Sequence, residues 1–194
     1  MDYDVVIIGG GPSGLATAIK LAQTFKEKNL EKSICLLEKS AEIGGHILSG
    51  NVFETTALDE LIPDWKEKGA PLDVKVKRDA IKFLINYKYS LPVPSFVMPT
   101  MQNHGNYILS LGNLCRWLAE QAEALGVDIF PGFPAAEIIF RDDKVAGVVT
   151  GDMGVDSEGN PKDSFQPGME IIANEATVFA AVSYTHLRAH ETRT

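Results

Sequence analysis

The chain has 194 residues, 45% of them hydrophobic, which suffices for one domain with a buried core or for a cofactor domain with part of a second. Its formal net charge of −8 argues against nucleic acid as a partner, because a phosphate backbone attracts basic surfaces. The two cysteines, Cys35 and Cys115, have no C-x-x-C spacing, so we expect neither a disulfide framework nor a self-contained metal or iron–sulfur site.

Residues 4–38 have the pattern of a β-α-β unit. The run 4–8 is short, apolar and rich in β-branched residues, as in a parallel strand that is buried on both faces. From Pro12 onward apolar residues recur at helical spacing, and 34–37 is a second buried strand pattern. The charged segment 26–32 is the predicted turn between the helix and this strand.

A glycine fingerprint lies between the first strand and the helix. Gly9, Gly11 and Gly14 form G-x-G-x-x-G, whose glycines make a tight turn, admit a pyrophosphate and let helix and strand pack closely. The helix N-terminus offers amide groups and partial positive charge to the phosphates. Glu38 ends the second strand, where a carboxylate accepts hydrogen bonds from a ribose. The alternative is a tight loop next to a surface acid.

A second glycine-rich run, 43–50, follows the predicted ribose-binding acid directly. It resembles the segment of the large two-dinucleotide-fold flavoprotein superfamily in which the chain returns along the cofactor, and this resemblance favours FAD over NAD. The predicted cofactor contacts are therefore Gly9, Gly11, Pro12, Ser13, Gly14, Glu38, Lys39, Gly44, Gly45, His46, Ser49 and Gly50. We predict no catalytic side chain and no metal ligand, and His104 is interpreted as a loop residue.

The remainder of the chain gives a coarser pattern of short elements. Thr56 is the predicted cap of a short helix that Pro63 ends, and Asn113 is the predicted cap of a helix that Gly126 ends. Further strands are predicted over 127–130, 135–140 and 145–150, with a hairpin turn at 141–143, a long loop over 151–168, and two strand patterns in 169–181 separated by Asn174 and Glu175.

Residues 83–101 are apolar but contain several prolines, which excludes a long helix and a central strand. One hypothesis is an exposed hairpin or loop that enters one leaflet of a membrane, with nearby lysines facing anionic headgroups. The alternative is an ordinary apolar loop that covers a sheet. No apolar run reaches the ~20 residues of a membrane-spanning helix, and the first strand begins at Tyr3, so we expect no signal or transit peptide.

Four segments together resemble the electron transfer flavoprotein-ubiquinone oxidoreductase family. They are 43–50 (IGGHILSG), 62–72 (IPDWKEKGAPL), 102–111 (QNHGNYILSL) and 117–127 (WLAEQAEALGV). The resemblance implies an FAD-dependent oxidoreductase of electron transport that passes electrons from reduced electron transfer flavoprotein to membrane ubiquinone. It also implies a [4Fe-4S] cluster in the longer parent only, and a peripheral position on the cytoplasmic face of a bacterial inner membrane, or on the mitochondrial inner membrane.

The predicted fold class is α/β: an FAD-binding, Rossmann-like β-α-β domain with an inserted mixed β-sheet region, in a truncated chain. The predicted divisions are 1–65 for the FAD-binding region, 66–172 for the inserted substrate- and membrane-facing region, 173–181 for a strand that returns to the FAD domain, and 182–194 for a non-native tail.

Two alternatives to this function stay open. The first is a related flavoprotein of the geranylgeranyl-reductase or hydroxylase type, which acts on a lipid-like substrate. The second is a truncated fragment without activity, because the resemblance implies that the family's cluster cysteines lie near the C-terminus of longer chains.

Overall fold

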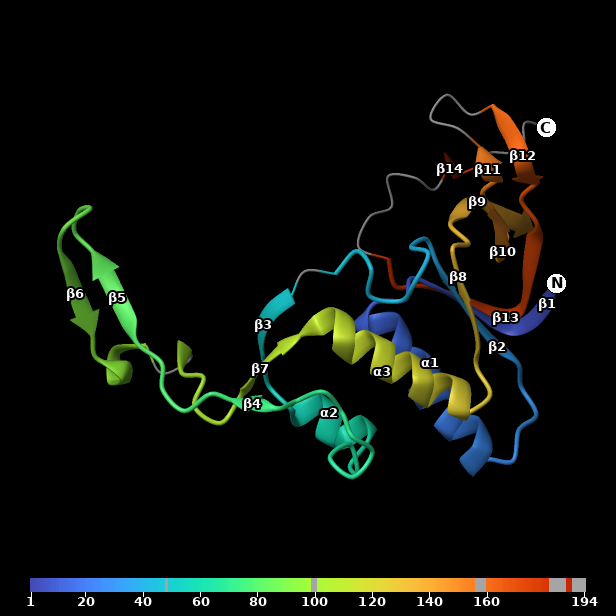
Figure 1. Cartoon of the computed structure of the whole chain (residues 1–194). Helices are drawn as coiled ribbons and strands as arrows, with labels where there is room; N and C mark the ends of the chain where they lie inside the picture. The colour runs from blue at the N-terminus through green and yellow to red at the C-terminus, as the bar shows by residue number, and fades with distance from the viewer. Residues whose placement is uncertain (48, 99–100, 156–159, 182–187, 190–194) are drawn as a thin grey trace. The chain divides into compact units, whose positions relative to one another are not determined.

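The computed structural model describes residues 1–47, 49–98, 101–155, 160–181 and 188–189 (Figure 1). By internal contacts the chain divides into two compact units, the first formed by 1–47 with 115–194 and the second by 48–114. These bounds differ from the predicted ones, since residues 115–172 group with the first unit. The prediction that 182–194 is a non-native tail falls largely outside the described residues.

The first unit is built on a seven-stranded mixed sheet of order β14-β9-β10-β13-β1-β2-β8. Strands β1, β2, β8 and β13 are parallel to their neighbours within this group, whereas β10 pairs antiparallel with both β13 and β9. The predicted α/β class with a mixed sheet is therefore confirmed. The strands are β1 (Asp2–Ile8), β2 (Ile34–Glu38), β8 (Asp128–Pro131), β9 (Ala135–Arg141), β10 (Lys144–Thr150), β13 (Glu170–Phe179) and β14 (Arg188–Ala189).

The β-α-β unit at the centre of this sheet matches its sequence pattern. Helix α1 (Pro12–Glu27) packs on β1 and β2, and its side chains Leu15 and Ile19 are fully buried. Side chains alternate along a strand, so Ile7 and Leu36 lie on one face of the sheet. The residues next to them in sequence point to the other face and belong to a core cluster there: Val6, Ile8, Cys35 and Leu37. Both faces of β1 and β2 are covered, as the continuous apolar runs predicted.

The second unit contains two small sheets. One has the order β3-β7-β4, formed by β3 (Ser49–Phe53), β7 (Tyr107–Ser110) and β4 (Val74–Lys75). The other is the hairpin of β5 (Ile81–Leu84) and β6 (Ser90–Val93), followed by the 3-10 turn η1 (Ser95–Val97). Trp65 is buried, donates to Asp59 of α2 (Thr56–Leu61) at 2.7 Å, and meets Tyr107 edge to face, which ties the helix to β7.

Both predicted helix caps are wrong by position. Helix α3 (Leu111–Ala124) already includes Asn113, whose backbone amide donates to the Ser110 hydroxyl at 3.4 Å, so Ser110 holds the cap position. Thr56 is the first residue of α2, and the residue before it is the N-cap. The N-cap residue of α2 makes no side-chain cap hydrogen bond, unlike Ser110. Gly126, with a φ of +89°, ends α3 as predicted.

Two other predictions need correction in the strand region. Part of the predicted loop 151–168 forms two antiparallel strands, β11 (Met153–Val155) and β12 (Pro161–Gln166), which pair with each other. The two strand patterns predicted in 169–181 are one strand, β13. Its pairing with β1 shifts at Asn174 and Glu175, where two residues lie opposite one.

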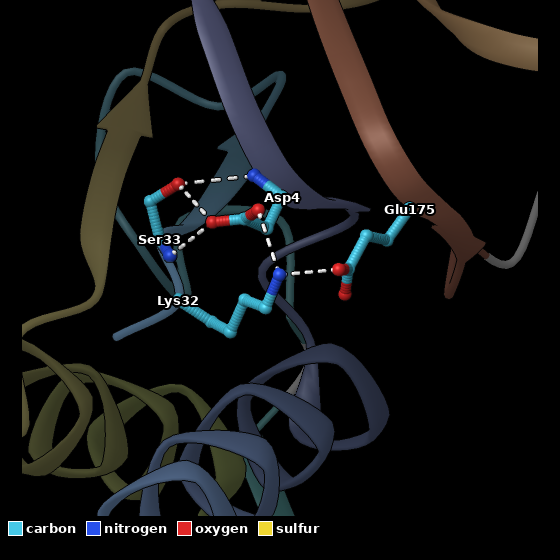
Figure 2. Close-up of polar contacts among 4 residues, drawn as sticks. All are labelled: Asp4, Lys32, Ser33 and Glu175. Carbon is cyan, nitrogen blue, oxygen red and sulfur yellow. Dashed lines mark hydrogen bonds and ion pairs between the residues drawn. The ribbon is translucent and has the colours of Figure 1, made fainter. Parts of the chain in front are cut away.

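This shift in β13 lies beside a polar cluster of Asp4, Lys32, Ser33 and Glu175 (Figure 2). The Asp4 carboxylate accepts from the Ser33 amide at 2.8 Å and from its hydroxyl at 2.9 Å. Lys32 is ion-paired with both Asp4 and Glu175. The extra residue of β13 thus supplies a carboxylate to the segment that enters β2, and the cluster links β1, β2 and β13 at one end of the sheet.

We predict that Asp4→Asn lowers stability only above acidic pH. Hydrogen bonds from Ser33, and then the charge of Lys32, hold the pKa of Asp4 below its ordinary value of 3.8. A lowered folded-state pKa contributes stability that is present above 3.8 and is lost as the pH falls through the folded-state value. Urea unfolding of wild type and variant should therefore differ at neutral pH and converge below that window. Asp2→Asn in the same strand is the control, and a pH-independent difference would contradict the prediction.

Candidate dinucleotide-binding site

The glycine-rich loop has the geometry that the fingerprint predicts. Gly9 has a φ of +113°, and a Cβ there would lie 3.0 Å from the backbone of Ala180 and Ala181. A Cβ on Gly14 would lie 2.0 Å from the Gly9 carbonyl oxygen, so the helix touches the loop at this point. A Cβ on Gly11 would meet nothing within 4 Å. The first and third glycines serve packing, whereas the second faces open space where a ligand can approach.

The start of α1 suits an anion. Gly11 is its N-cap residue and offers no side-chain cap, Pro12 occupies the first turn, and that turn holds no acidic residue. The first amides of a helix have no partner within the helix and carry partial positive charge. An anionic group beside Gly11 would therefore be attracted without competition from a carboxylate of the first turn.

Glu38 turns its carboxylate toward the glycine-rich loop. One oxygen, Oε2, accepts from the Gly10 amide at 2.7 Å, and the other, Oε1, accepts from the Ser40 amide at 2.8 Å. The side chain is half-buried. The acid thus lies beside the predicted phosphate-binding loop, as the fingerprint requires.

A cavity of about 330 Å³ opens within the first unit over these elements. Six of the predicted contacts line it: Gly9, Gly11, Glu38, Lys39, Gly44 and His46. Pro12, Ser13, Gly14 and Gly45 adjoin these residues in sequence without lining the cavity. Ser49 and Gly50 begin β3 in the second unit, so their contact with a cofactor stays a prediction.

The second glycine pair shapes the chain after β2. Gly44 has a φ of +82°, which favours glycine, and a Cβ on Gly45 would lie 2.5 Å from the hydroxyl oxygen of the buried Ser40. The tight turn leaves His46 exposed at the cavity. The segment 43–47 therefore folds back to the same cavity as the fingerprint.

One wall of the cavity was missed from the sequence. It is formed by Phe133, Pro134 and Ala135. The amides of Gly132 and Phe133 donate to the carbonyl oxygens of Ser40 and Glu38, at 2.7 and 3.0 Å, which continues the β2–β8 pairing beyond the strand ends. Gly132 and Pro134 are turn residues, but without the β2–β8 pairing they do not indicate a ligand.

The described residues contain no group of three or more His, Cys, Asp or Glu that could hold a metal ion. Cys35 and Cys115 are both fully buried, and burial raises their pKa values to about 12 and about 11. No helix within the described ranges is both long enough and apolar enough to cross a bilayer.

Residues 7–63 match a family model described as an NAD(P)-binding Rossmann-like domain. The match spans the glycine fingerprint, Glu38 and the second glycine pair. It supports a dinucleotide-binding fold for this segment.

Curated relatives match almost the whole chain. It is 54% identical over 190 residues to the electron transfer flavoprotein-ubiquinone oxidoreductase of Pseudomonas aeruginosa, which covers 96% of this chain and 34% of the relative. It is 48% identical over 187 residues to the human mitochondrial protein of the same name, which covers 96% of this chain and 30% of the relative. The chain thus spans about a third of the length of these relatives. The resemblance predicted from the four motifs is confirmed.

Solved structures share the fold at low identity. A geranylgeranyl bacteriochlorophyll reductase-like protein from Thermoplasma acidophilum superimposes with a TM-score of 0.64 at 23% identity, over 92% of this chain and 39% of that one. A myxobacterial chondrochloren halogenase, described as FAD-dependent, gives 0.61 at 19% identity, over 96% and 38%. At these identities the likeness establishes the fold.

We predict that Gly14→Ala destabilises the protein and that Gly11→Ala does not. The added methyl at position 14 collides with the Gly9 carbonyl, and separating helix from loop should cost about 1–3 kcal/mol, as overpacking does elsewhere. The methyl at position 11 meets no atom within 4 Å. Thermal unfolding of the apoprotein checks this, and equal melting temperatures of the two variants would contradict the packing role of Gly14.

Proposed function

We propose that this chain binds FAD and forms the cofactor-binding part of an electron transfer flavoprotein-ubiquinone oxidoreductase. The observation that carries the proposal is the open space at Gly11 beside an acid-free helix N-terminus and Glu38, in a chain 54% identical to such an enzyme. When bound, FAD supplies the redox chemistry of electron transfer.

Different residues of the first unit would bind different parts of FAD. Gly11 and the first turn of α1 would hold the pyrophosphate, and Glu38 would accept hydrogen bonds from the adenosine ribose. Lys39 and His46 line the same cavity, and we propose both as further contacts, His46 toward the flavin side. The apolar wall at Phe133 and Pro134 would exclude water from the bound cofactor.

FAD is preferred to NAD because the segment 43–47 returns to the cavity. Gly44 and His46 line it together with Gly9 and Glu38, so two separate glycine-rich segments meet at one site. An NAD-binding domain normally enters a helix after the ribose-binding acid. The family model names NAD(P), but it matches the fingerprint region that both cofactors share.

The partners we propose for the whole protein are reduced electron transfer flavoprotein, as electron donor, and ubiquinone, as acceptor. The names of the relatives support both. We assign the [4Fe-4S] cluster to the longer protein, because the resemblance implies that its cysteine ligands lie near the C-terminus of longer chains. The proposed location is peripheral, on the cytoplasmic face of a bacterial inner membrane, or the mitochondrial inner membrane in a eukaryote.

The β5–β6 hairpin is our proposed membrane contact. Its register pairs Phe83 with Leu91 and Ile81 with Val93, so these four side chains share one face. Phe83 and Leu91 are 65% and 56% exposed. Residues 80–98 include two lysines and no acid, although the chain as a whole carries a net charge of −8. An apolar face in a hairpin that carries lysines and no acid fits an anionic lipid surface.

The geranylgeranyl-reductase type of enzyme is the second candidate function. A protein with a name of that type shares the fold, but at 23% identity against 54% for the oxidoreductase relative, so the first proposal is better supported. Ubiquinone reduction by the full-length parent, with electron transfer flavoprotein as donor, separates the two. A truncated chain without activity of its own remains compatible with the assignment of the parent.

We expect the purified chain to take up FAD and to show flavin absorbance. Gly11→Ala should weaken FAD binding about tenfold or more, because its methyl group occupies the approach to the pyrophosphate. Titration followed by flavin fluorescence measures this, with NAD titrated in parallel. A chain that stays colourless while folded, or that binds NAD in preference, would contradict the flavin assignment.

Binding to lipid vesicles tests whether the β5–β6 hairpin contacts a membrane. Phe83→Ser should reduce co-sedimentation with phosphatidylcholine–phosphatidylglycerol vesicles about tenfold, because a buried Phe side chain contributes about 1.5–3 kcal/mol. Leu84→Ser is the matched control: Leu84 is 73% exposed but lies on the opposite face. An equal loss of vesicle binding in both variants would contradict the proposal that only the Phe83 face of the hairpin contacts lipid.

A further inference from the structure

The glycine-rich loop is tied to β2 by the Gly9 amide, which donates to the Leu37 carbonyl oxygen at 2.8 Å, and by one side chain. Glu38 bridges two backbone amides, with Gly10 on Oε2 at 2.7 Å and Ser40 on Oε1 at 2.8 Å. Its own carbonyl oxygen accepts from Phe133 at 3.0 Å. Three segments that line the cavity therefore converge on this residue.

The carboxylate has capacity for both this bridge and a ligand. Each of its two oxygens carries two lone pairs, and each accepts one backbone amide. One lone pair on each oxygen is left for hydroxyl donors. Two neighbouring ribose hydroxyls can therefore bind without displacing either amide.

Gly10 supplies an independent observation. The fingerprint allows any residue at this position, yet a Cβ on Gly10 would lie 3.1 Å from Oε2 of Glu38, 3.0 Å from its Cβ and 2.6 Å from Cδ1 of Ile43. A methyl group at Gly10 would therefore collide with Cδ1 of Ile43 and would crowd the Glu38 side chain. The contact between loop and acid is thus a packed one as well as a hydrogen bond.

We propose that Glu38 is a positioning residue that fastens the glycine-rich loop to the turn at Ser40 before any cofactor binds. Its role toward the ribose rests on the proposed function, but the fastening does not. The binding surface is then preorganised. The conformational entropy of the loop is lost during folding, so cofactor binding does not have to order the loop.

The amide isostere separates this proposal from a ligand-only role. In Glu38→Gln one oxygen becomes an NH2 group, and either orientation of the amide turns this donor toward a backbone N–H. One of the two bridges must break. A residue that only contacts ribose would lose cofactor affinity in this variant and leave the apoprotein unchanged.

The test is amide hydrogen exchange by NMR on the apoprotein of the full chain. We expect Glu38→Gln to speed exchange at Gly10 or Ser40 about tenfold or more, with the Leu36 amide in β2 still protected. Glu27→Gln, an exposed residue at the end of α1, is the matched control and should leave both amides unchanged. Unchanged protection at both amides in Glu38→Gln overturns the proposal, even if FAD affinity falls.

A second variant keeps the proposal testable if Glu38→Gln unfolds the protein. If Glu38→Gln also exposes Leu36, Gly10→Ala is measured instead, since it keeps the charge and every amide but crowds the Glu38 side chain and Cδ1 of Ile43. Faster exchange at Gly10 and Ser40 supports the fastening, and unchanged protection overturns it. Failure of wild type to bind FAD would count against the proposed function and leave these apoprotein measurements valid.

Discussion

The contact between Gly14 and the Gly9 carbonyl is the constraint on which the site depends. Because a Cβ at Gly14 would lie 2.0 Å from that oxygen, α1 can begin directly against the end of β1 only if this residue has no side chain. This approach sets the direction of the helix N-terminus and the position of Gly11. The same loop meets Glu38 at the end of β2, where the Gly10 amide donates to its carboxylate at 2.7 Å, so the proposed phosphate-binding and ribose-binding groups lie side by side.

The β-α-β unit was predictable because its signals are local. Continuous apolar runs at 4–8 and 34–37, and helical spacing between them, describe elements that are buried in a predictable way. The glycine fingerprint added a mechanical reason for each of its three glycines. Of the predicted residues that line the cavity, Glu38 follows from this unit, whereas Gly44 and His46 follow from the resemblance of 43–50 to a flavoprotein superfamily.

What escaped prediction depends on pairing between distant segments. The wall at 133–135 reaches the site because β8 pairs with β2, and no local pattern encodes that register. Asn174 and Glu175 read as a break, yet β13 continues through them because β1 tolerates an extra residue opposite Asp4. The face that Phe83 shares with Leu91 in the β5–β6 hairpin likewise appears only when the register is known.

The burial of Cys35 and Cys115 has a practical consequence for labelling experiments. Burial raises the pKa values of both thiols to about 12 and about 11, so at neutral pH neither supplies the thiolate that reacts with alkylating agents or peroxides. On unfolding, both thiols become exposed and reactive, so the rate at which they are labelled reports the rate of unfolding without an engineered probe.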